Sequence, residues 1–169
     1  MDFEFTPQEE QFRAELRGFL AQHLPADWSD RSFIEAADSD ERRALAQEMT
    51  RLLAQKDWLA LAWPKQFGGL DAGHLMQLIY NEETAYRAMP GGGGAGVTAV
   101  GPAIMLFGDQ EQKDTYLPRI ARGEDQWSLL YTEPGSGSDL ASIQTRAVRD
   151  GDEFVINGQK IWIAGAQDA

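Results

Sequence analysis

The residues best suited to chemistry lie between positions 126 and 164. Residues 127–132 alternate in side-chain character and lead through Glu133 into the loop Pro-Gly-Ser-Gly-Ser at residues 134–138. Glycines let backbone N–H groups approach a flat or anionic ligand closely, and Ser138 adds a hydroxyl and another amide. Such a loop suits the acceptor-rich edge of a cofactor. Composition alone, however, favours a plain Pro-Gly turn between two strands.

Other candidate motifs are weaker. Gly91, Gly93 and Gly96 match G-x-G-x-x-G, but a dinucleotide site needs a strand before the first glycine, and here a helical segment and a proline precede it. We interpret the run as a flexible loop. Glu82 and Glu83 are neighbours, about 100° apart on a helix, so they do not form a facing carboxylate pair. We expect at least one of them to lie on a solvated face.

Composition excludes several classes of function. The 169 residues include 15 basic and 27 acidic side chains, which gives 15 − 27 = −12, and this charge disfavours nucleic-acid binding. The absence of cysteine removes thiol nucleophiles and Cys-based metal sites. Two histidines leave little for metal binding or a Ser-His triad. No apolar run approaches the roughly 18 residues of a membrane span, and the N-terminus lacks a basic start, so we expect a cytoplasmic protein.

The first two thirds of the chain predicts helices. Thr6 and Glu9 form a capping box, Pro7 suits the first helical position, and Pro25 ends the run. A second helix carries Leu45, Met49, Leu52 and Leu53 on one face and closes near Lys56. A third turns Leu75, Leu78, Ile79 and Tyr86 inward, and a fourth carries Val100, Ile104 and Phe107. A fifth begins at a capping signal of Asp109 and Gln112 and is interrupted by Pro118.

From Gln126 the pattern becomes that of strands. Residues 127–132 alternate as in a half-buried strand, and strands at 145–148 and 154–156 flank a turn at Asp150-Gly151. A further hairpin turn at Asn157-Gly158 leads into a strand at 160–163. The expected fold class is therefore α+β, all helical to about residue 123 and antiparallel β afterwards. No closing element follows the last strand.

Several sequence runs, in order, resemble acyl-CoA dehydrogenases. In the β portion they are residues 131–139 (YTEPGSGSD), 145–147 (TRA), 151–153 (GDE) and 157–163 (NGQKIWI). In the helical portion they are residues 63–69 (WPKQFGG), 81–83 (NEE), 108–113 (GDQEQK) and 116–118 (YLP). The resemblance covers nearly the whole chain, and ordered motifs are more specific than any single one.

The resemblance implies three domains, with FAD held between a central β-barrel and a C-terminal helical domain. It makes residues 1–123 the N-terminal helical domain and residues 124–169 part of the middle β-barrel domain, with the C-terminal helical domain absent. The family's catalytic base, a glutamate, lies in that absent part. No catalytic residue is therefore assigned here, and Glu133 matches a loop position.

The resemblance also implies a set of binding residues. Trp162 matches the aromatic residue beside the isoalloxazine ring, and Ser138 matches a position that touches acyl-CoA as well as flavin. Ala164 replaces a threonine that in many relatives hydrogen-bonds the flavin. The positions matching flavin contacts are Leu129, Leu130, Tyr131, Thr132, Gly137, Ser138, Trp162, Ile163 and Ala164. The remaining tryptophans, Trp28, Trp58, Trp63 and Trp127, are expected to be packing residues.

The activity implied by the resemblance is the α,β-desaturation of an acyl-CoA thioester, with electrons passing to an electron-transferring flavoprotein. Homo- or hetero-oligomers, dimers or tetramers, are implied for the full-length protein. The loop and the 63–69 run look most like bacterial members, some of which act on branched or steroid side-chain thioesters. Two alternatives stay open: a structural subunit without a working site in a mixed oligomer, and an acyl-CoA oxidase that passes electrons to oxygen.

Overall fold

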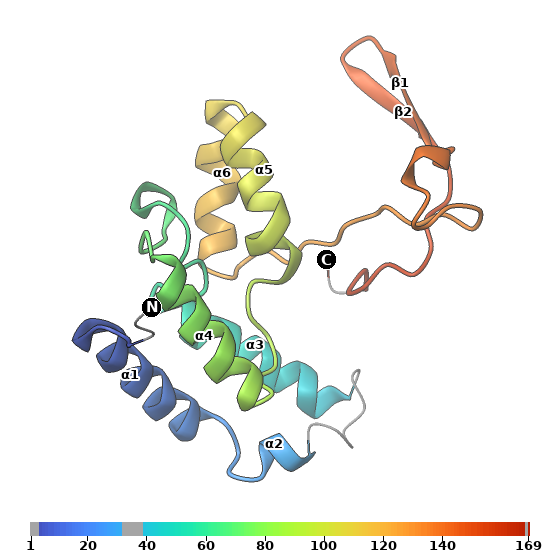
Figure 1. Ribbon diagram of the computed structural model, residues 1–169. Coiled ribbons are helices and arrows are strands. Elements are labelled where there is room, and N and C mark those ends of the chain that lie inside the picture. Colours follow the sequence, from blue (N-terminus) through green and yellow to red (C-terminus); the bar gives the residue numbers. More distant parts are fainter. Residues whose placement is uncertain (1–3, 32–38, 168) are drawn as a thin grey trace. The chain divides into compact units, whose positions relative to one another are not determined.

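The computed structural model describes residues 4–31, 39–167 and 169. The chain divides into two compact units, an N-terminal unit ending at Asp125 and a C-terminal unit beginning at Gln126. The N-terminal unit is helical and the C-terminal unit contains the strands (Figure 1). This order confirms the predicted fold class.

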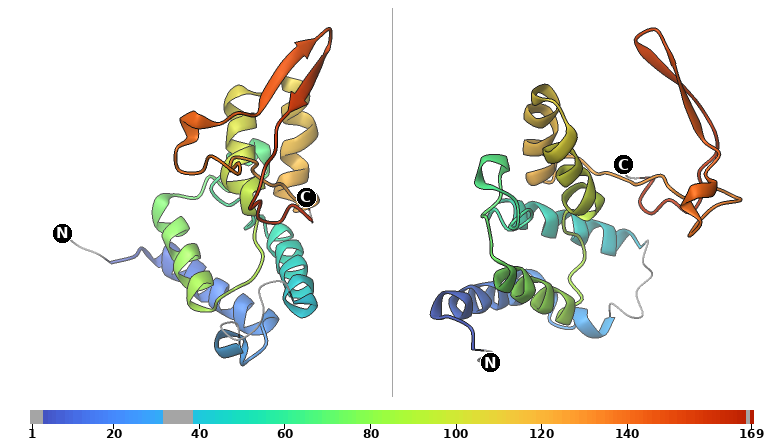
Figure 2. Two further views of the ribbon diagram at one scale, coloured as in Figure 1. Left: turned by 90° about the vertical axis from the view of Figure 1, so that its right-hand side faces the viewer. Right: turned by 45° about the horizontal axis from the view of Figure 1, so that its top comes forward.

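In its described residues, 4–31 and 39–125, the N-terminal unit contains six α-helices and two short helical turns. The α-helices are α1 (Pro7–His23), α2 (Trp28–Arg31), α3 (Asp40–Ala54), α4 (His74–Tyr86), α5 (Gly101–Phe107) and α6 (Gln110–Ala121). A 3-10 turn, η1, spans Lys65–Phe67, and a π-helical turn, η2, spans Gly96–Val100 directly before α5. Helix α1 packs along α4, and α5 packs along α6 (Figures 1 and 2).

Both predicted capping boxes are present. At α1 the Thr6 hydroxyl accepts the Glu9 N–H at 3.3 Å, and the Glu9 carboxylate accepts the Thr6 N–H at 2.7 Å. Asp109 and Gln112 do the same at the start of α6. The predicted interruption at Pro118 is wrong, because α6 continues to Ala121. Proline removes one helical hydrogen bond, but the buried residues Leu117 and Ile120 hold the last turn against the unit.

An apolar core joins α1 to α3, α4 and the segment around Trp58. Phe12 and Phe19 of α1 both meet the Trp58 ring nearly edge to face, with ring centroids 5.4 and 5.5 Å apart. Each large side chain buried this way contributes about 1.5–3 kcal/mol. Trp28, Trp58 and Trp63 are buried, as expected, and Trp127 is half-buried.

Helix α4 presents a different face to the core from the one predicted. Ile79 is buried, but Leu75, Leu78 and Tyr86 are 47%, 45% and 82% exposed. The reason is that Ile79 and Glu83, four residues apart, occupy the buried face of α4. The helical spacing of the apolar residues predicted a wider buried face than the neighbouring helix covers.

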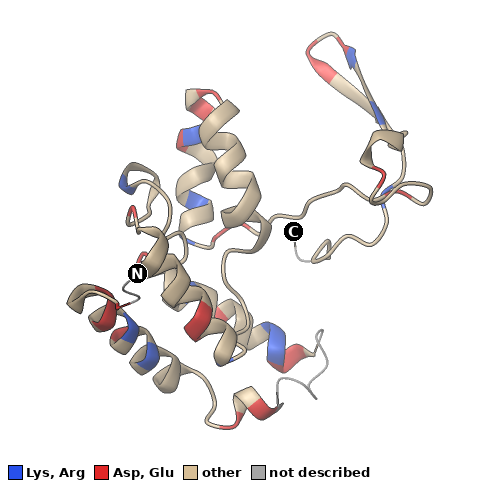
Figure 3. Ribbon diagram, in the orientation of Figure 1, with Lys and Arg blue, Asp and Glu red and all other residues tan. Residues whose placement is uncertain are grey.

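A charged pair lies in the α1–α4 interface, where Figure 3 shows basic and acidic positions on the two helices. The Glu83 side chain is 8% exposed and accepts the Arg17 guanidinium through both oxygens, at 2.8 and 2.9 Å. The hydrogen bonds to Glu83, and next the negative charge of Glu83, raise the pKa of Arg17. Glu82, 53% exposed, reaches Arg13 at 3.4 Å. One of the two adjacent glutamates is thus solvated, as expected, and the other is buried and paired.

The C-terminal unit contains one antiparallel hairpin in its described residues. Strand β1 (Arg146–Asp150) pairs with β2 (Glu153–Asn157), with Val148 opposite Val155. Gly151 lies in the connecting turn with φ of 62°, a value that favours glycine. The hairpin forms the upper ribbon of this unit in Figure 1, and all ten strand residues are exposed.

The strands predicted at 127–132 and 160–163 are absent from the described structure. Both segments lack regular secondary structure, and the predicted second hairpin at Asn157-Gly158 does not form a ladder. Alternating side chains indicate a possible strand, whereas a strand also requires a continuous row of partner hydrogen bonds. Within the helical unit, no described helix is long and apolar enough to cross a membrane.

Candidate functional site

Two segments of the C-terminal unit, 128–132 and 160–164, lie side by side in opposite directions. The N–H of Ile161 donates to the Thr132 carbonyl at 3.0 Å. At the other end, the Ser128 hydroxyl donates to the Ala164 carbonyl at 2.9 Å. The structure therefore brings together two groups of predicted site residues, those near Tyr131 and those near Trp162.

The loop between them begins with a tight turn. Glu133 and Ser136 exchange two backbone hydrogen bonds, at 2.8 and 3.1 Å, and both residues are buried. The Ser136 hydroxyl donates to the Asp139 carbonyl at 2.7 Å, and this bond fixes the second half of the loop, residues 136–139. Gly137 and Ser138, in this second half of the loop, are exposed. In the described structure, no hydrogen bond joins these two to the Trp162 segment.

The Glu133 carboxylate is the most heavily bonded polar group near the loop. It accepts the N–H of Gln144 at 2.7 Å, the N–H of Thr145 at 2.9 Å and the Lys160 ammonium at 2.9 Å. Hydrogen bonding by Thr145, then by the Gln144 N–H and Lys160, lowers the pKa of Glu133 to about 2. The carboxylate is therefore ionised at neutral pH, and its low pKa makes it unsuited to accept a proton from substrate.

The predicted flavin positions near the two segments are largely open to solvent. Leu129, Leu130 and Tyr131 are 37%, 58% and 56% exposed, and Trp162 is 87% exposed. Thr132 and Ile163 are half-buried, and Ala164 is exposed. Trp162 also has a positive φ of 57°, a backbone conformation uncommon for an aromatic residue and frequent at functional sites. These side chains leave apolar surface uncovered.

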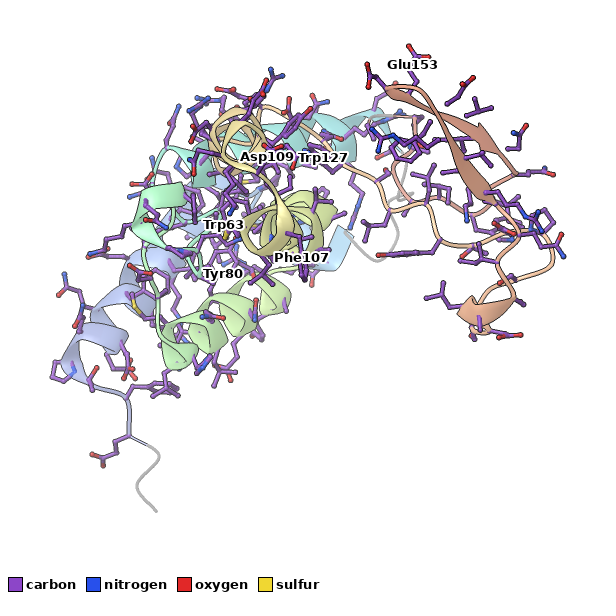
Figure 4. The ribbon with its side chains drawn as sticks, turned by 90° about the horizontal axis from the view of Figure 1, so that it is seen from above. Trp63, Tyr80, Phe107, Asp109, Trp127 and Glu153 are labelled. Atoms are coloured by element: carbon purple, nitrogen blue, oxygen red, sulfur yellow. The ribbon has the colours of Figure 1, made fainter. Side chains whose placement is uncertain are left out.

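A second candidate site is a pocket of about 880 Å³ within the N-terminal unit. Its walls are the segment 59–64, helix α4, the glycine run 91–94 and the start of α5. Trp63 and Tyr80, labelled in Figure 4, line it from two of these elements. The Trp63 indole N–H donates to the Val97 carbonyl at 3.1 Å, which fixes the ring. Burial raises the pKa of Tyr80 to about 12, so its phenol stays neutral.

The glycine run is a wall of this pocket. Helix α4, and no strand, precedes it, which confirms that it is no dinucleotide fingerprint. Gly91 has φ of 85°, and a Cβ there would collide with the Ala46 carbonyl. A glycine is therefore needed where the chain passes α3, and the residues that follow leave one side of the pocket without side chains. Sequence reasoning missed this role because the opposite wall comes from distant segments.

Comparison with known proteins gives a consistent picture. Residues 6–124 match the N-terminal domain of acyl-CoA dehydrogenases, and residues 128–169 match the middle domain. The whole chain is 38% identical to acyl-CoA dehydrogenase FadE26 of Mycobacterium tuberculosis and spans 42% of that protein. FadE29 of the same organism is 37% identical and is also spanned to 42%. The chain thus spans about two fifths of the length of these relatives.

Solved structures resemble the chain as well. The Tcur3481–Tcur3483 steroid acyl-CoA dehydrogenase matches all of it at a TM-score of 0.86 and 39% identity, over 43% of that chain. A subunit of the ChsE4–ChsE5 complex from Mycobacterium tuberculosis matches 96% of it at a TM-score of 0.79 and 40% identity, over 40% of that chain.

Proposed function

Because the chain belongs to the acyl-CoA dehydrogenase family, we propose that it forms the substrate- and flavin-facing part of an enzyme that desaturates an acyl-CoA thioester with FAD. The observation that carries this proposal is the exposed apolar surface of Leu129, Tyr131 and Trp162 beside the loop at 134–138. FAD, when bound, supplies the acceptor for the hydride that leaves the acyl β-carbon.

The residues present fit a flavin. A flat ring needs an apolar surface to lie on, and Trp162 and its neighbours provide one. The polar ring edge needs donors, and in the described part of the chain the N–H groups of Gly137 and Ser138 have no protein acceptor. Within the C-terminal unit, residues 129–132, 137–138 and 162–164 are thus our proposed flavin contacts. Ser138 is proposed to touch the acyl-CoA too.

The proton acceptor is proposed to come from elsewhere in the enzyme. A catalytic base must take up a proton readily, whereas the donors around Glu133 stabilise its ionised form and hold its pKa at about 2. The role that we propose for the described chain is therefore to bind and orient FAD and the thioester.

We further propose that the pocket of the N-terminal unit holds the acyl group. Its volume of about 880 Å³ falls near the upper end of ordinary ligand pockets and suits a bulky apolar group. The similarity to a protein described as a steroid acyl-CoA dehydrogenase favours a steroid side-chain thioester. Neutral polar groups on α4, such as the Tyr80 phenol, could orient such a group by hydrogen bonding.

A matched pair of variants tests the pocket. Met105 lines it, whereas Leu106, the next residue of α5, is 74% exposed and outside it. In the FAD-loaded enzyme, Met105→Trp should raise KM for a steroid side-chain CoA thioester about tenfold or more, because the indole occupies space that the acyl group needs. Leu106→Trp should leave KM within about twofold. Equal KM values for the two variants would contradict the assignment.

The reaction is tested by mixing enzyme and thioester without oxygen and following the flavin absorbance. Bleaching with formation of the α,β-unsaturated thioester is expected, with reoxidation by an electron-transferring flavoprotein. Retention of the flavin colour with every CoA thioester would contradict the proposal. Peroxide formed in air at the rate of turnover would instead indicate an oxidase.

A structural-subunit role is the second candidate, favoured by Ala164 and by the two-component assemblies among the similar structures. In that case FAD binding and turnover would appear only after a second, different subunit is added.

A further inference from the structure

The Glu133 carboxylate joins three separate parts of the C-terminal unit. One oxygen, Oε2, accepts the N–H of Gln144 at 2.7 Å. The other, Oε1, accepts the N–H of Thr145 at 2.9 Å and the Lys160 ammonium at 2.9 Å. We call Glu133, Lys160 and the two N–H groups the carboxylate clamp. Its members come from the start of the loop, from the residues before β1 and from the segment after β2.

Lys160 extends the clamp to the neighbouring segment. Its ammonium also donates to the Tyr131 carbonyl at 3.0 Å, and its side chain is only 16% exposed. The adjoining Ile161 N–H donates to the Thr132 carbonyl at 3.0 Å. Segments 131–133 and 160–161 are therefore held together by two backbone carbonyls and one ion pair.

Close packing at the base of the hairpin supports the same contact. A Cβ atom on Gly158 would collide with the Thr145 side chain, so the two ends of the hairpin approach closely only because position 158 is glycine. The clamp lies where residues 144–145 enter the hairpin and residues 158–160 leave it. The exposed hairpin and the loop thus share one anchoring point.

The place of the clamp in the sequence links it to both sets of proposed flavin contacts. Glu133 is followed after four and five residues by Gly137 and Ser138, and Lys160 is followed after two and four residues by Trp162 and Ala164. The Glu133–Ser136 turn connects the carboxylate to the loop, and the Ser128–Ala164 bond holds the far end of the other segment. A shift at the clamp would therefore move the donors of the loop relative to the apolar surface around Trp162.

We propose that Glu133 is a positioning residue that, through Lys160, fixes the loop at 134–138 against the segment at 160–164 and so sets the geometry of the flavin site. The inference rests on the proposed function, since it assigns the two segments to the flavin. Glu133 itself contacts neither flavin nor substrate. It acts through Lys160 and the loop.

The need for a charge distinguishes this role from a simple hydrogen-bonded turn. A buried ion pair leaves an uncompensated charge when one partner is removed, so the structure around it has to rearrange. Glu133→Gln keeps the shape of the side chain but places an amide NH₂ opposite one of the donors. Lys160→Met removes the ammonium and leaves both backbone N–H bonds to Glu133 possible. Lys160→Arg restores a positive charge.

The test uses the FAD-loaded enzyme and measures the FAD dissociation constant, the visible spectrum and the reduction potential of the bound flavin. Glu133→Gln and Lys160→Met should each weaken FAD binding about ten- to a hundredfold and shift the potential, since small misplacements of binding groups have effects of that size. Lys160→Arg should recover most of the affinity. Glu153→Gln, in the exposed strand β2, is the matched control and should stay within about twofold of wild type.

Two results would overturn the inference in different ways. If wild-type enzyme binds FAD and the folded clamp variants keep its affinity, spectrum and potential, Glu133 serves only the fold. If wild-type enzyme itself takes up no FAD under any condition, the proposed flavin site fails and the positioning role fails with it. If Glu133→Gln does not fold, Lys160→Met decides, because it retains the backbone part of the clamp.

Discussion

Glu133 shows how strongly neighbouring hydrogen-bond donors can lower the pKa of a single carboxyl group. Its three donors, from Gln144, Thr145 and Lys160, lie 11, 12 and 27 residues further along the chain. The sequence predicts a glycine-rich loop, because a loop depends on local residue types, and the family resemblance singles out Trp162. The sequence could not predict the clamp, since that depends on where the hairpin returns. A lysine directly before the apolar run Ile161-Trp162-Ile163 is the one local signal for it.

The low pKa of Glu133 predicts a dependence of stability on pH. Its folded-state pKa of about 2 is below the ordinary 4.5, so the clamp contributes fully above about pH 4.5 and is lost as the pH falls toward 2. Protection factors of the Gln144 and Thr145 amides should fall in that window. Glu133→Gln should remove this fall, and Glu153→Gln should retain it. Equal pH profiles for wild type and Glu133→Gln would contradict the assignment.

Replacing Ala164 by threonine should change the reduction potential of the bound flavin. A threonine there can donate a hydrogen bond to the proposed ring, and one bond contributes about 0.5–1.5 kcal/mol, equivalent to a shift of roughly 10–30 mV for a two-electron couple. The bond from Ser128 goes to the backbone carbonyl of residue 164 and can survive the substitution. Reductive titration of the Ala164→Thr enzyme measures the shift. Ala166→Thr is the control, and unchanged potential and affinity in Ala164→Thr would place residue 164 away from the ring.

At the scale of elements, the helices were predictable where the signals are local. The capping boxes at Thr6 and Asp109 require residues only three positions apart, and both are present. The inward face of α4 was predicted correctly at Ile79 and wrongly at Leu75, Leu78 and Tyr86. Periodicity does not show which part of the apolar face of a helix a neighbouring helix covers. The segment 127–132 lacks its predicted ladder for a related reason. Alternating side chains are a property of one segment, whereas a β-ladder also needs a second segment that forms hydrogen bonds with the first.

Truncating a side chain on the buried face of α4 should destabilise the protein much more than truncating one on the exposed face. Ile79 is fully buried, and Leu78 beside it is 45% exposed. Ile79→Ala should lower the free energy of unfolding by about 2–5 kcal/mol, because it leaves a cavity against α1 and the core. Leu78→Ala should cost less than about 1 kcal/mol. Urea unfolding followed by helical circular dichroism measures both, and similar losses would mean that α4 is rotated from the orientation described.

At the scale of the whole chain, the two units differ in how they bury their residues. The N-terminal unit has a joined apolar core, whereas Val148, Phe154, Val155 and Ile156 of the hairpin are all exposed. A two-stranded hairpin without a covered face is marginal by itself. The helical unit was predictable because each helix has its own sequence signals. The extent of the β unit was not, because its order depends on partner surfaces.

Residues 1–169 alone should therefore show unequal protection from hydrogen exchange. Amides of α1 should exchange slowly, because opening them exposes the core, and amides of β1 and β2 should exchange close to the rate of unstructured peptides. The same chain should also hold FAD weakly, because the proposed contacts form one open surface. Slow exchange throughout residues 146–157 of a verified monomer, or stoichiometric yellow flavin on purification, would contradict these expectations.

The exposure of Trp162 has an optical consequence. Of the five tryptophans, Trp28, Trp58 and Trp63 are buried and Trp127 is half-buried, whereas Trp162 is 87% exposed. A collisional quencher dissolved in water should therefore remove the emission of Trp162 first, while the indoles of the core continue to fluoresce. The chain carries its own reporter at the proposed flavin surface, and a ligand that covers residue 162 can be followed by the loss of the quenchable fraction without any attached dye.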